Sequence, residues 1–457
     1  MDQSQIVDDG VSDVEEGGEH GSLKINQKRY RSYANIVREF IYERNAYITT
    51  WNRVRQQVPG DTFLPNLQIL RWECAADDTF HNIRHFLSPS SLTSIYVNFA
   101  WSCQAAKFTK LLPRKALHLT AIDLDYDDEV DSNEVRQICT MLQSYPHIRR
   151  VGIYAVDADA VKLLSELSRI AHLRLDIRDE FAESWRTLGG TYEFPSLESM
   201  KLIWWSTKAT YATNILLDTI HAAHLRSVIL LPLFCIMPAD MKTTLAIVSK
   251  KHSSIHRLRI SRVPETRFQF ARTYNTYVPT YDQETMHPLL SMGDLRVFQS
   301  EGMNICLTDS GTKQMTLAWP LLQELSILGD GMDGLDIRAL RYFAKNCADI
   351  RKIDIPCCVG IYSKRTGIMG RYEYDYNTSK PPRIEHPVYI GRSSFFFVGT
   401  DCIQVVFCAW ILCSIFRYPL IEPPGSLEEC VYSAQRIRDE CAGYDWSLND
   451  KDSTIIC

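Results

Sequence analysis

The sequence lacks the short motifs that usually identify an enzyme or a metal protein. It contains no Walker-type phosphate loop, no Gly-x-Ser-x-Gly nucleophile turn and no His-Glu-x-x-His zinc motif. Its 14 cysteines are scattered, and none forms a Cys-x-x-Cys pair or a cysteine–histidine set with zinc-ligand spacing. We therefore expect no catalytic residues, no cofactor and no metal.

Signals for export, membrane insertion or polyanion binding are also lacking. Residues 1–22 contain no apolar core of a signal peptide, and scattered thiols without such a signal indicate a cytoplasmic or nuclear protein. A net charge of −5 gives no reason to expect binding to nucleic acid. Asp401 and Gln404 interrupt the apolar stretch 395–416, which is too short for a membrane span once they are excluded. We expect a buried helix there that closes the fold, and no membrane partner.

The two ends of the chain differ from its middle. Residues 1–27 begin as an acidic stretch without Lys or Arg up to Ser22, and we expect them to be disordered. Residues 28–60 are predicted to form a helical N-terminal cap, with a helix over Lys28–Tyr47, and a linker. Residues 358–457 are expected to form a C-terminal cap and an irregular tail.

One apolar pattern recurs eleven times between residues 61 and 357, at an average spacing of about 28 residues. It has the form apolar-x-x-apolar-x-apolar, and only the ninth case has a polar third position. The copies are Leu67-Leu70-Trp72, Leu92-Ile95-Val97, Leu119-Ile122-Leu124, Ile148-Val151-Ile153, Ile170-Leu173-Leu175, Leu197-Met200-Leu202, Leu225-Val228-Leu230, Ile255-Leu258-Ile260, Leu295-Phe298-Ser300, Leu322-Leu325-Ile327 and Ile350-Ile353-Ile355. The one long step, from Ile255 to Leu295, predicts a loop insertion within Pro264–Gln283.

This repeat predicts an α/β fold, a leucine-rich-repeat solenoid. Alternating apolar residues face one side of a short strand, and stacking such strands in parallel buries a continuous apolar ladder. The connections include helical patterns at Glu134–Leu142, Ala158–Leu167 and Ile337–Cys347. The fold is therefore expected to be a horseshoe with an inner parallel sheet and outer helices. A doubly wound α/β domain, which also alternates strands and helices, remains the alternative.

Two groups of polar residues resemble metal-binding motifs, but each lacks one residue that its motif requires. From Asp123 to Glu134, oxygen-bearing residues fall where an EF-hand needs them, but Asp128 stands where its sharp turn requires Gly. His81 and His85 have the spacing of two zinc ligands, but no glutamate lies between them. We interpret both as ordinary surface residues.

The predicted working surface is the concave face of the sheet. In each triplet the residue between the second and third apolar positions points away from the core, onto that face. The column contains Arg71, Tyr96, Asp123, Gly152, Arg174, Lys201, Ile229, Arg259, Gln299, Ser326 and Asp354. We predict partner contacts at Tyr96, Arg174, Lys201 and Arg259, with an ordinary solvated face as the alternative. Trp204-Trp205 and Ile229–Phe234 are either further partner contacts or buried residues.

Several segments resemble fungal F-box/leucine-rich-repeat proteins, especially those of mushroom-forming fungi. Leu64–Leu67, Phe194–Ser199 and Trp319–Leu325 are similar to the F/W-P-x-L-x-x-L opening of their repeats. Ile337–Ile355 resembles a late repeat of that family, and Arg29–Arg38 resembles the segment that follows its F-box. The F-box itself, expected before Arg29, is missing or unrecognisable.

The resemblance implies a non-catalytic, protein-binding role. Members of that family act as substrate-recognition subunits of SCF-type ubiquitin ligases, so the implied partners are an unknown protein and the ligase adaptor. The alternative is a stand-alone leucine-rich-repeat scaffold without a ligase.

Overall fold

The computed structural model describes residues 27–42, 63–73, 83–87, 90–99, 102–126, 131–181, 184–185, 190–262, 279–329, 335–336, 339–355, 357–358, 388–390, 395–396 and 419–421. The acidic stretch before residue 27, most of the predicted insertion at 264–283 and most of the apolar stretch 395–416 lie outside these residues.

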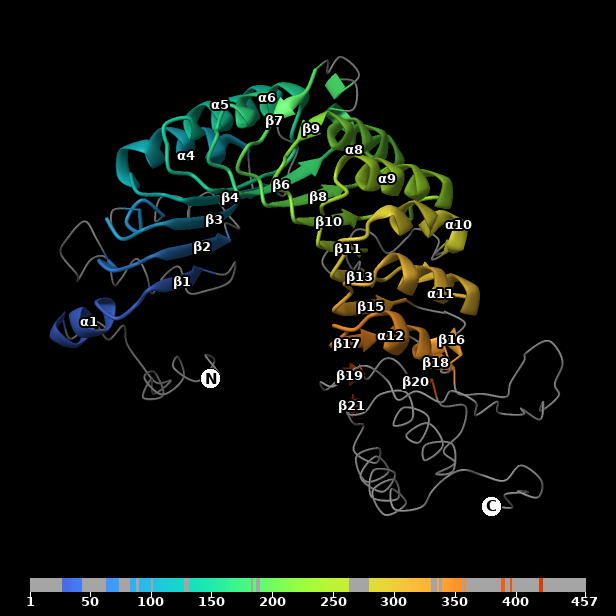
Figure 1. Cartoon of the computed structure of the whole chain (residues 1–457). Helices are drawn as coiled ribbons and strands as arrows, with labels where there is room; N and C mark the ends of the chain where they lie inside the picture. The colour runs from blue at the N-terminus through green and yellow to red at the C-terminus, as the bar shows by residue number, and fades with distance from the viewer. Residues whose placement is uncertain are drawn as a thin grey trace, which may run out of the picture.

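A single parallel sheet runs through the molecule, and within the described residues it has fourteen strands in strictly sequential order. Figure 1 shows the strands lining the inner side of an arch. They are β1 (Glu39–Tyr42), β2 (Ile69–Glu73), β3 (Ser94–Phe99), β4 (Ala121–Tyr126), β5 (Arg150–Ile153), β6 (His172–Ile177), β8 (Ser199–Trp204), β10 (Ser227–Pro232), β11 (Arg257–Ser261), β13 (Val297–Glu301), β15 (Glu324–Leu328), β17 (Lys352–Asp354), β19 (Val388–Ile390) and β21 (Pro419–Ile421).

The repeated triplets build the core of this arch, as the sequence predicts. The middle residue of each triplet lies on one of the neighbouring parallel strands from β2 to β17, the first residue lies just before that strand, and every triplet residue is at most 2% exposed. Strand pairing places the middle residues side by side, for example Ile95 beside Ile122 and Ile122 beside Val151. The strand order never reverses, whereas a doubly wound sheet has a reversal point, so the structure is a leucine-rich-repeat solenoid.

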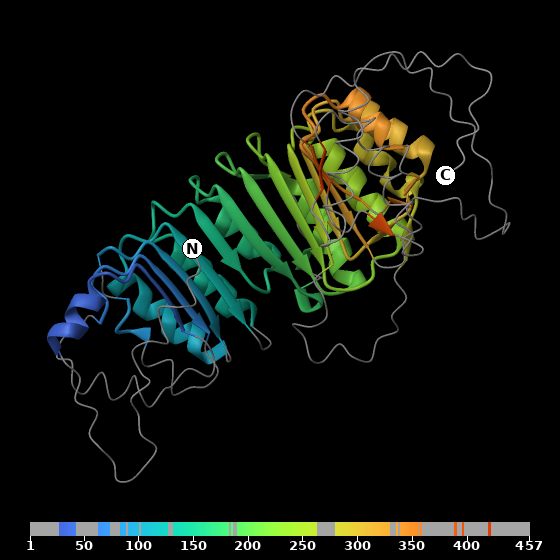
Figure 2. The same cartoon turned by 90° about the horizontal axis from the view of Figure 1, so that it is seen from below.

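Helices cover the outer side of the arch (Figure 1). Seen from below in Figure 2, the strands lie in front and the helices behind them. The helices are α1 (Gln27–Ala34), α4 (Ser102–Lys115), α5 (Ser132–Leu142), α6 (Ala158–Ser165), α8 (Thr207–Thr219), α9 (Pro238–Lys251), α10 (Gln283–Met286), α11 (Asp309–Ala318) and α12 (Leu340–Asn346). The predicted helical segments correspond to α5, α6 and α12. In α5, Val135, Ile138, Cys139 and Leu142 recur at helical spacing and are buried against the sheet.

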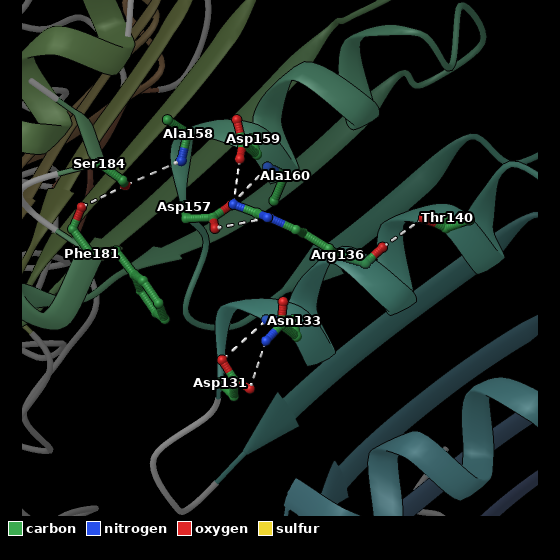
Figure 3. A network of polar contacts seen from close by, with 10 residues as sticks. All are labelled: Asp131, Asn133, Arg136, Thr140, Asp157, Ala158, Asp159, Ala160, Phe181 and Ser184. Atoms are coloured by element: carbon green, nitrogen blue, oxygen red, sulfur yellow. Dashed lines mark hydrogen bonds and ion pairs between the residues drawn. The ribbon is translucent and has the colours of Figure 1, made fainter. Parts of the chain in front are cut away.

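A polar clamp joins α5 to α6, and Figure 3 shows it from close by. Asp157 caps α6 by accepting a hydrogen bond from the Ala160 backbone N–H at 2.8 Å. Its other carboxylate oxygen lies 3.7 Å from Nε of Arg136, and Arg136 also pairs with Asp159. Because Arg136 belongs to α5, the clamp fixes two consecutive helices relative to each other on the outer side.

The N-terminal part differs from the sequence prediction. A helix was expected over Lys28–Tyr47, but α1 ends at Ala34 and residues 39–42 form strand β1. The expectation was wrong there because Phe40, which fits the helical spacing, instead packs against the core from β1, where it stacks on Phe86 with ring centroids 4.8 Å apart. Strand pairing with β2 overrides the weak local helical pattern.

The sheet also extends beyond residue 357, through β19 and β21. Smaller parallel sheets connect other parts of the repeats: β7 (Tyr192–Glu193) with β9 (Ile220–His221), β12 (Thr280–Tyr281) with β14 (Asn304–Ile305), and β16 (Leu335–Asp336) with β18 (Cys357–Cys358) and β20 (Phe395–Phe396). Residues 395–396, expected to start a buried helix, are therefore a strand, and the rest of that stretch lies outside the described residues. No described helix combines the length and apolar character that crossing a bilayer requires.

Candidate functional site

The predicted column of outward-pointing residues lies on the concave face of the sheet. Tyr96 is on β3, Arg174 on β6, Lys201 on β8 and Arg259 on β11, and all four are half-buried. With neighbouring strands about 4.8 Å apart, Arg174 and Lys201 lie side by side and Arg259 is roughly 10 Å from Lys201. Tyr96 is three strands from Arg174, or about 15 Å. The structure thus brings the three cations together and leaves Tyr96 apart from them.

Arg174 is held by two carboxylates of the same chain. Its Nη1 donates to Oδ1 of Asp123 and its Nη2 to Oδ2 of Asp125, each at 2.7 Å. Both aspartates belong to β4, so the guanidinium reaches across β5, which lies between β4 and β6. Arg174 therefore joins three consecutive repeats within the chain, and we call this arrangement with Asp123 and Asp125 the Arg174 clamp.

Gly152 provides the room for this clamp. It stands on β5 between Asp123 and Arg174 in the strand register. A Cβ atom at Gly152 would lie 2.3 Å from Oδ1 of Asp123, far inside van der Waals contact. A larger residue there would push the carboxylate away from the guanidinium, so the glycine is part of the clamp.

The charges of the clamp are partly removed from water. Burial raises the pKa of Asp123, and the adjacent Asp125 carboxylate raises it further, against the opposing effect of Arg174. For Arg174, burial works against the charged form, but the two carboxylates outweigh it, so its pKa is raised and it stays protonated. The clamp therefore consists of a permanent cation shared by two competing carboxylates.

Lys201 differs from its neighbours because its side chain makes no ion pair or hydrogen bond with any described residue. Burial lowers its pKa, and the positive charge of Arg174 on the next strand lowers it further. The carboxylates of Asp123 and Asp125 act in the opposite direction and raise the pKa of Lys201. Arg259, by contrast, pairs with Glu301 at 2.8 Å, and Glu301 also accepts a hydrogen bond from Ser261. Lys201 is therefore a half-buried cation without a direct carboxylate contact among the described residues, whereas Arg174 and Arg259 each have one.

A second cluster stands at the carboxyl ends of β5, β6 and β8, and of its residues only Trp205 was singled out from the sequence. The Arg178 guanidinium packs against the rings of both Tyr154 and Trp205, 4.2 and 4.1 Å from their centroids, and the two rings meet edge to face. The Trp205 indole donates to Oδ1 of Asp176 at 2.6 Å. Asp176 is 2% exposed, and burial raises its pKa well above the usual range. Tyr154 and Trp205 are each more than 20 residues from Asp176 and Arg178 in the chain, and the pairing of β5, β6 and β8 brings them together.

The two apolar patches named above are largely buried. Trp204 is fully buried and donates to Oγ1 of Thr210 at 3.1 Å, so it belongs to the core. Trp205 is half-buried in the arginine cluster. In Ile229–Phe234, Leu230 faces the core, and Ile229 is half-exposed on the concave face. Of these residues, Ile229 is the one placed in the predicted column.

A glycine spacing typical of dinucleotide-binding loops follows β15, at Gly329, Gly331 and Gly334. Sequence inspection missed this pattern, but Gly329 has a packing role. A Cβ there would lie 2.3 Å from the carbonyl oxygen of Met303. Residues 330–334 lie outside the described residues, and the described strands of the main sheet follow one another without the reversal point at which a dinucleotide site forms.

The run that resembles a calcium loop begins in strand β4 with residues 123–126 and ends in the first turn of α5, while residues 127–130 lie outside the described residues. Asp123 and Asp125 point to Arg174 from β4, and Asp131 caps α5 by accepting from the Asn133 N–H. Within the described part of the chain, no three His, Cys, Asp or Glu side chains are grouped to hold a metal ion.

Comparison with known proteins gives structural likenesses only. No protein-family model and no curated protein matches the chain. LegL7, a leucine-rich-repeat protein of Legionella pneumophila, aligns at 10% identity with a TM-score of 0.39, over 83% of this chain and 99% of its own. A chain of the Drosophila Toll–Spätzle complex aligns at 10% identity and TM-score 0.37, over 64% of this chain and 34% of its own. A chain of the yeast Rad7–Elc1 complex aligns at 11% and TM-score 0.35, over 60% and 72%.

Proposed function

We propose that this chain is a non-catalytic protein-binding scaffold whose concave face is the docking surface. Lys201 is the observation that carries the proposal. A half-buried ammonium group loses hydration, and an anion from outside would compensate for that loss. The column around it also mixes apolar and charged groups, which the demands of the core do not explain. Extended concave faces of this kind are typical binding surfaces of solenoids.

The test starts from affinity capture of partners with the full chain, followed by cross-linking and mass spectrometry. Lys201→Glu and Ile229→Asp should each reduce binding of the captured partner by about tenfold or more. Lys208→Glu is the matched control, because Lys208 is exposed on helix α8. Equal binding by all three variants, with the fold intact, would place the docking surface elsewhere.

The narrower role is that of a substrate-recognition subunit in a ubiquitin ligase. The resemblance to F-box/leucine-rich-repeat proteins at Phe194–Ser199 and Trp319–Leu325 supports it. Calorimetry of the full chain with the purified ligase adaptor tests this role directly. Micromolar or tighter binding would support it, and lack of binding would leave a scaffold that works without the ligase.

A further inference from the structure

The amino-terminal ends of the central strands form a regular edge of the sheet. At each step, the carbonyl of the residue that precedes one strand accepts two backbone N–H groups from the start of the next. Arg149 accepts from residues 171 and 172, Arg226 from residues 256 and 257, and His256 from residues 296 and 297. The residue before each strand and the first residue of the strand are therefore held in line from repeat to repeat.

From β5 to β13 these aligned positions are strongly basic. We name this set the basic edge; it consists of Arg149, Arg150, His172, Arg226, His256, Arg257 and Arg296. All five arginines are exposed. Glu198 is the one acidic residue at the same positions of these six strands. The six strands span five steps, or about 24 Å along the edge.

The charge of the basic edge has little compensation within the described part of the chain. The side chains of Arg150, Arg257 and Arg296 make no ion pair or hydrogen bond there, and the Arg149 guanidinium approaches Glu198 only at 3.9 Å. Arg226 lies 3.4 Å from Nε2 of His256; burial and the charges of Arg226 and Arg296 lower the pKa of this histidine, so it supplies no anion for Arg226. Farther along the same strands, Arg174 and Arg259 are paired with carboxylates. The sheet thus pairs its two central arginines with carboxylates and leaves the arginines of its edge available.

The basic edge also adjoins a groove that is large enough to hold side chains of a bound segment. An open groove of about 480 Å³ is lined by Arg149, Arg169, Pro195, Ser196, Glu198 and His224. Arg169 is exposed and lies 2.8 Å from a ring nitrogen of His147. The groove would hold side chains of a segment that runs along the edge.

We propose that the basic edge binds an acidic, extended segment of a partner protein. This inference rests on the proposed scaffold function and specifies the chemistry of its partner. An extended segment of about eight residues spans roughly the length of the edge. Guanidinium groups bind carboxylates with paired, charge-assisted hydrogen bonds. Glu198 stands in the middle of the edge, and its carboxylate repels a negative group bound there. A peptide can place a neutral residue at this point, whereas a nucleic acid carries a charged phosphate at every nucleotide.

The experiment measures binding of a fluorescein-labelled peptide of about ten glutamates to the full chain by fluorescence anisotropy. We expect saturable binding that weakens as salt is raised, because the groups are exposed. Arg226→Gln/Arg257→Gln should weaken it at least about tenfold, as expected for loss of two charge-assisted contacts. The matched control is Arg114→Gln/Lys115→Gln, which removes the same charge from exposed positions of α4 and should leave affinity unchanged.

Three results would overturn the proposal. The first is equal affinity for the edge variant and its control. The second is tighter binding of a labelled single-stranded or duplex oligonucleotide than of the peptide. The third is peptide binding only when the seven carboxylates at 2, 8, 9, 13, 15, 16 and 19 are replaced by amides, which would make the chain's own acidic stretch the occupant. If the glutamate peptide does not bind but binding of a captured partner still depends on Lys201, the scaffold function is supported. Only the proposal of an acidic partner segment is then contradicted.

Discussion

At the scale of single residues, Gly152 shows how a small side chain can determine an ion pair on other strands. Gly152→Ala is expected to destabilise the fold by about 1–3 kcal/mol, because its Cβ would displace the Asp123 carboxylate. Chemical denaturation measures the change in the free energy of unfolding. Gly293→Ala is the control, since its Cβ would meet one backbone oxygen at 3.9 Å.

The structural cause of this effect can be tested separately. In an Asp123→Ala background the carboxylate is absent, so adding Gly152→Ala should cost clearly less than it does in the native chain. Equal costs in the two backgrounds would show that the glycine is needed for another reason, such as the conformation of β5.

The raised pKa of Asp176 predicts how the free energy of unfolding depends on pH. Burial raises its pKa well above the ordinary value, so the folded chain holds its proton more tightly than the unfolded chain. Stability therefore falls as pH rises from the usual Asp pKa to the raised one. Asp176→Asn removes this charge and retains an acceptor for Trp205, so it should increase stability at neutral pH.

The measurement compares denaturation midpoints of the native chain and Asp176→Asn across the acidic to neutral range. The difference between the two should grow with pH and then level off. Asp349→Asn, at an exposed position near the end of α12, is the control and should run parallel to the native chain. A parallel course for Asp176→Asn would mean that its carboxylate is not destabilised by burial.

At the scale of elements, the α5–α6 clamp contains a buried helix cap, Asp157, and an exposed partner of Arg136, Asp159. Their contributions to stability can be measured separately. Asp157→Ala should destabilise the fold by about 1–2 kcal/mol, because it removes the cap of α6 and one partner of Arg136. Asp159→Ala should cost less than about 1 kcal/mol, because that side chain is 62% exposed. Thermal denaturation of the two variants provides the comparison; equal losses would contradict the assignment of Asp157 as the main contact.

The elements also show what the sequence could and could not predict. Strands were found wherever the triplet gave a strong local signal, as at Leu119, Ile122 and Leu124. Strand β1 was missed because its apolar residues fit helical spacing and only pairing with β2 settles their conformation. The Arg174 clamp was hidden because it depends on strand register and on Gly152, neither of which is visible near Arg174 in the sequence. Arg174 was thus predicted as a partner contact from its position alone, which remains untested.

At the scale of the whole molecule, the sequential strand order predicts that a destabilising substitution affects mainly its own repeat and the neighbouring ones. Ile122 is fully buried on β4, and Ile122→Asp should destabilise the fold by several kcal/mol, because it buries an unpaired charge. Each repeat contacts mainly its neighbours, so the loss should be concentrated around β3, β4 and β5. Hydrogen exchange followed by mass spectrometry would then show lost protection there and retained protection in β13 and β15. Uniform loss along the arch would indicate a single cooperative unit.

The clamp across β5 has a mechanical consequence. A chain of stacked repeats pulled from its two ends transmits tension from each strand to the next, and it yields first at its weakest joint. The guanidinium of Arg174 fastens β6 directly to β4, so these repeats are joined by side chains as well as by backbone hydrogen bonds. Under traction in an optical trap, the arch should therefore unravel in steps, with the segment from Ala121 to Ile177 among the last to lengthen.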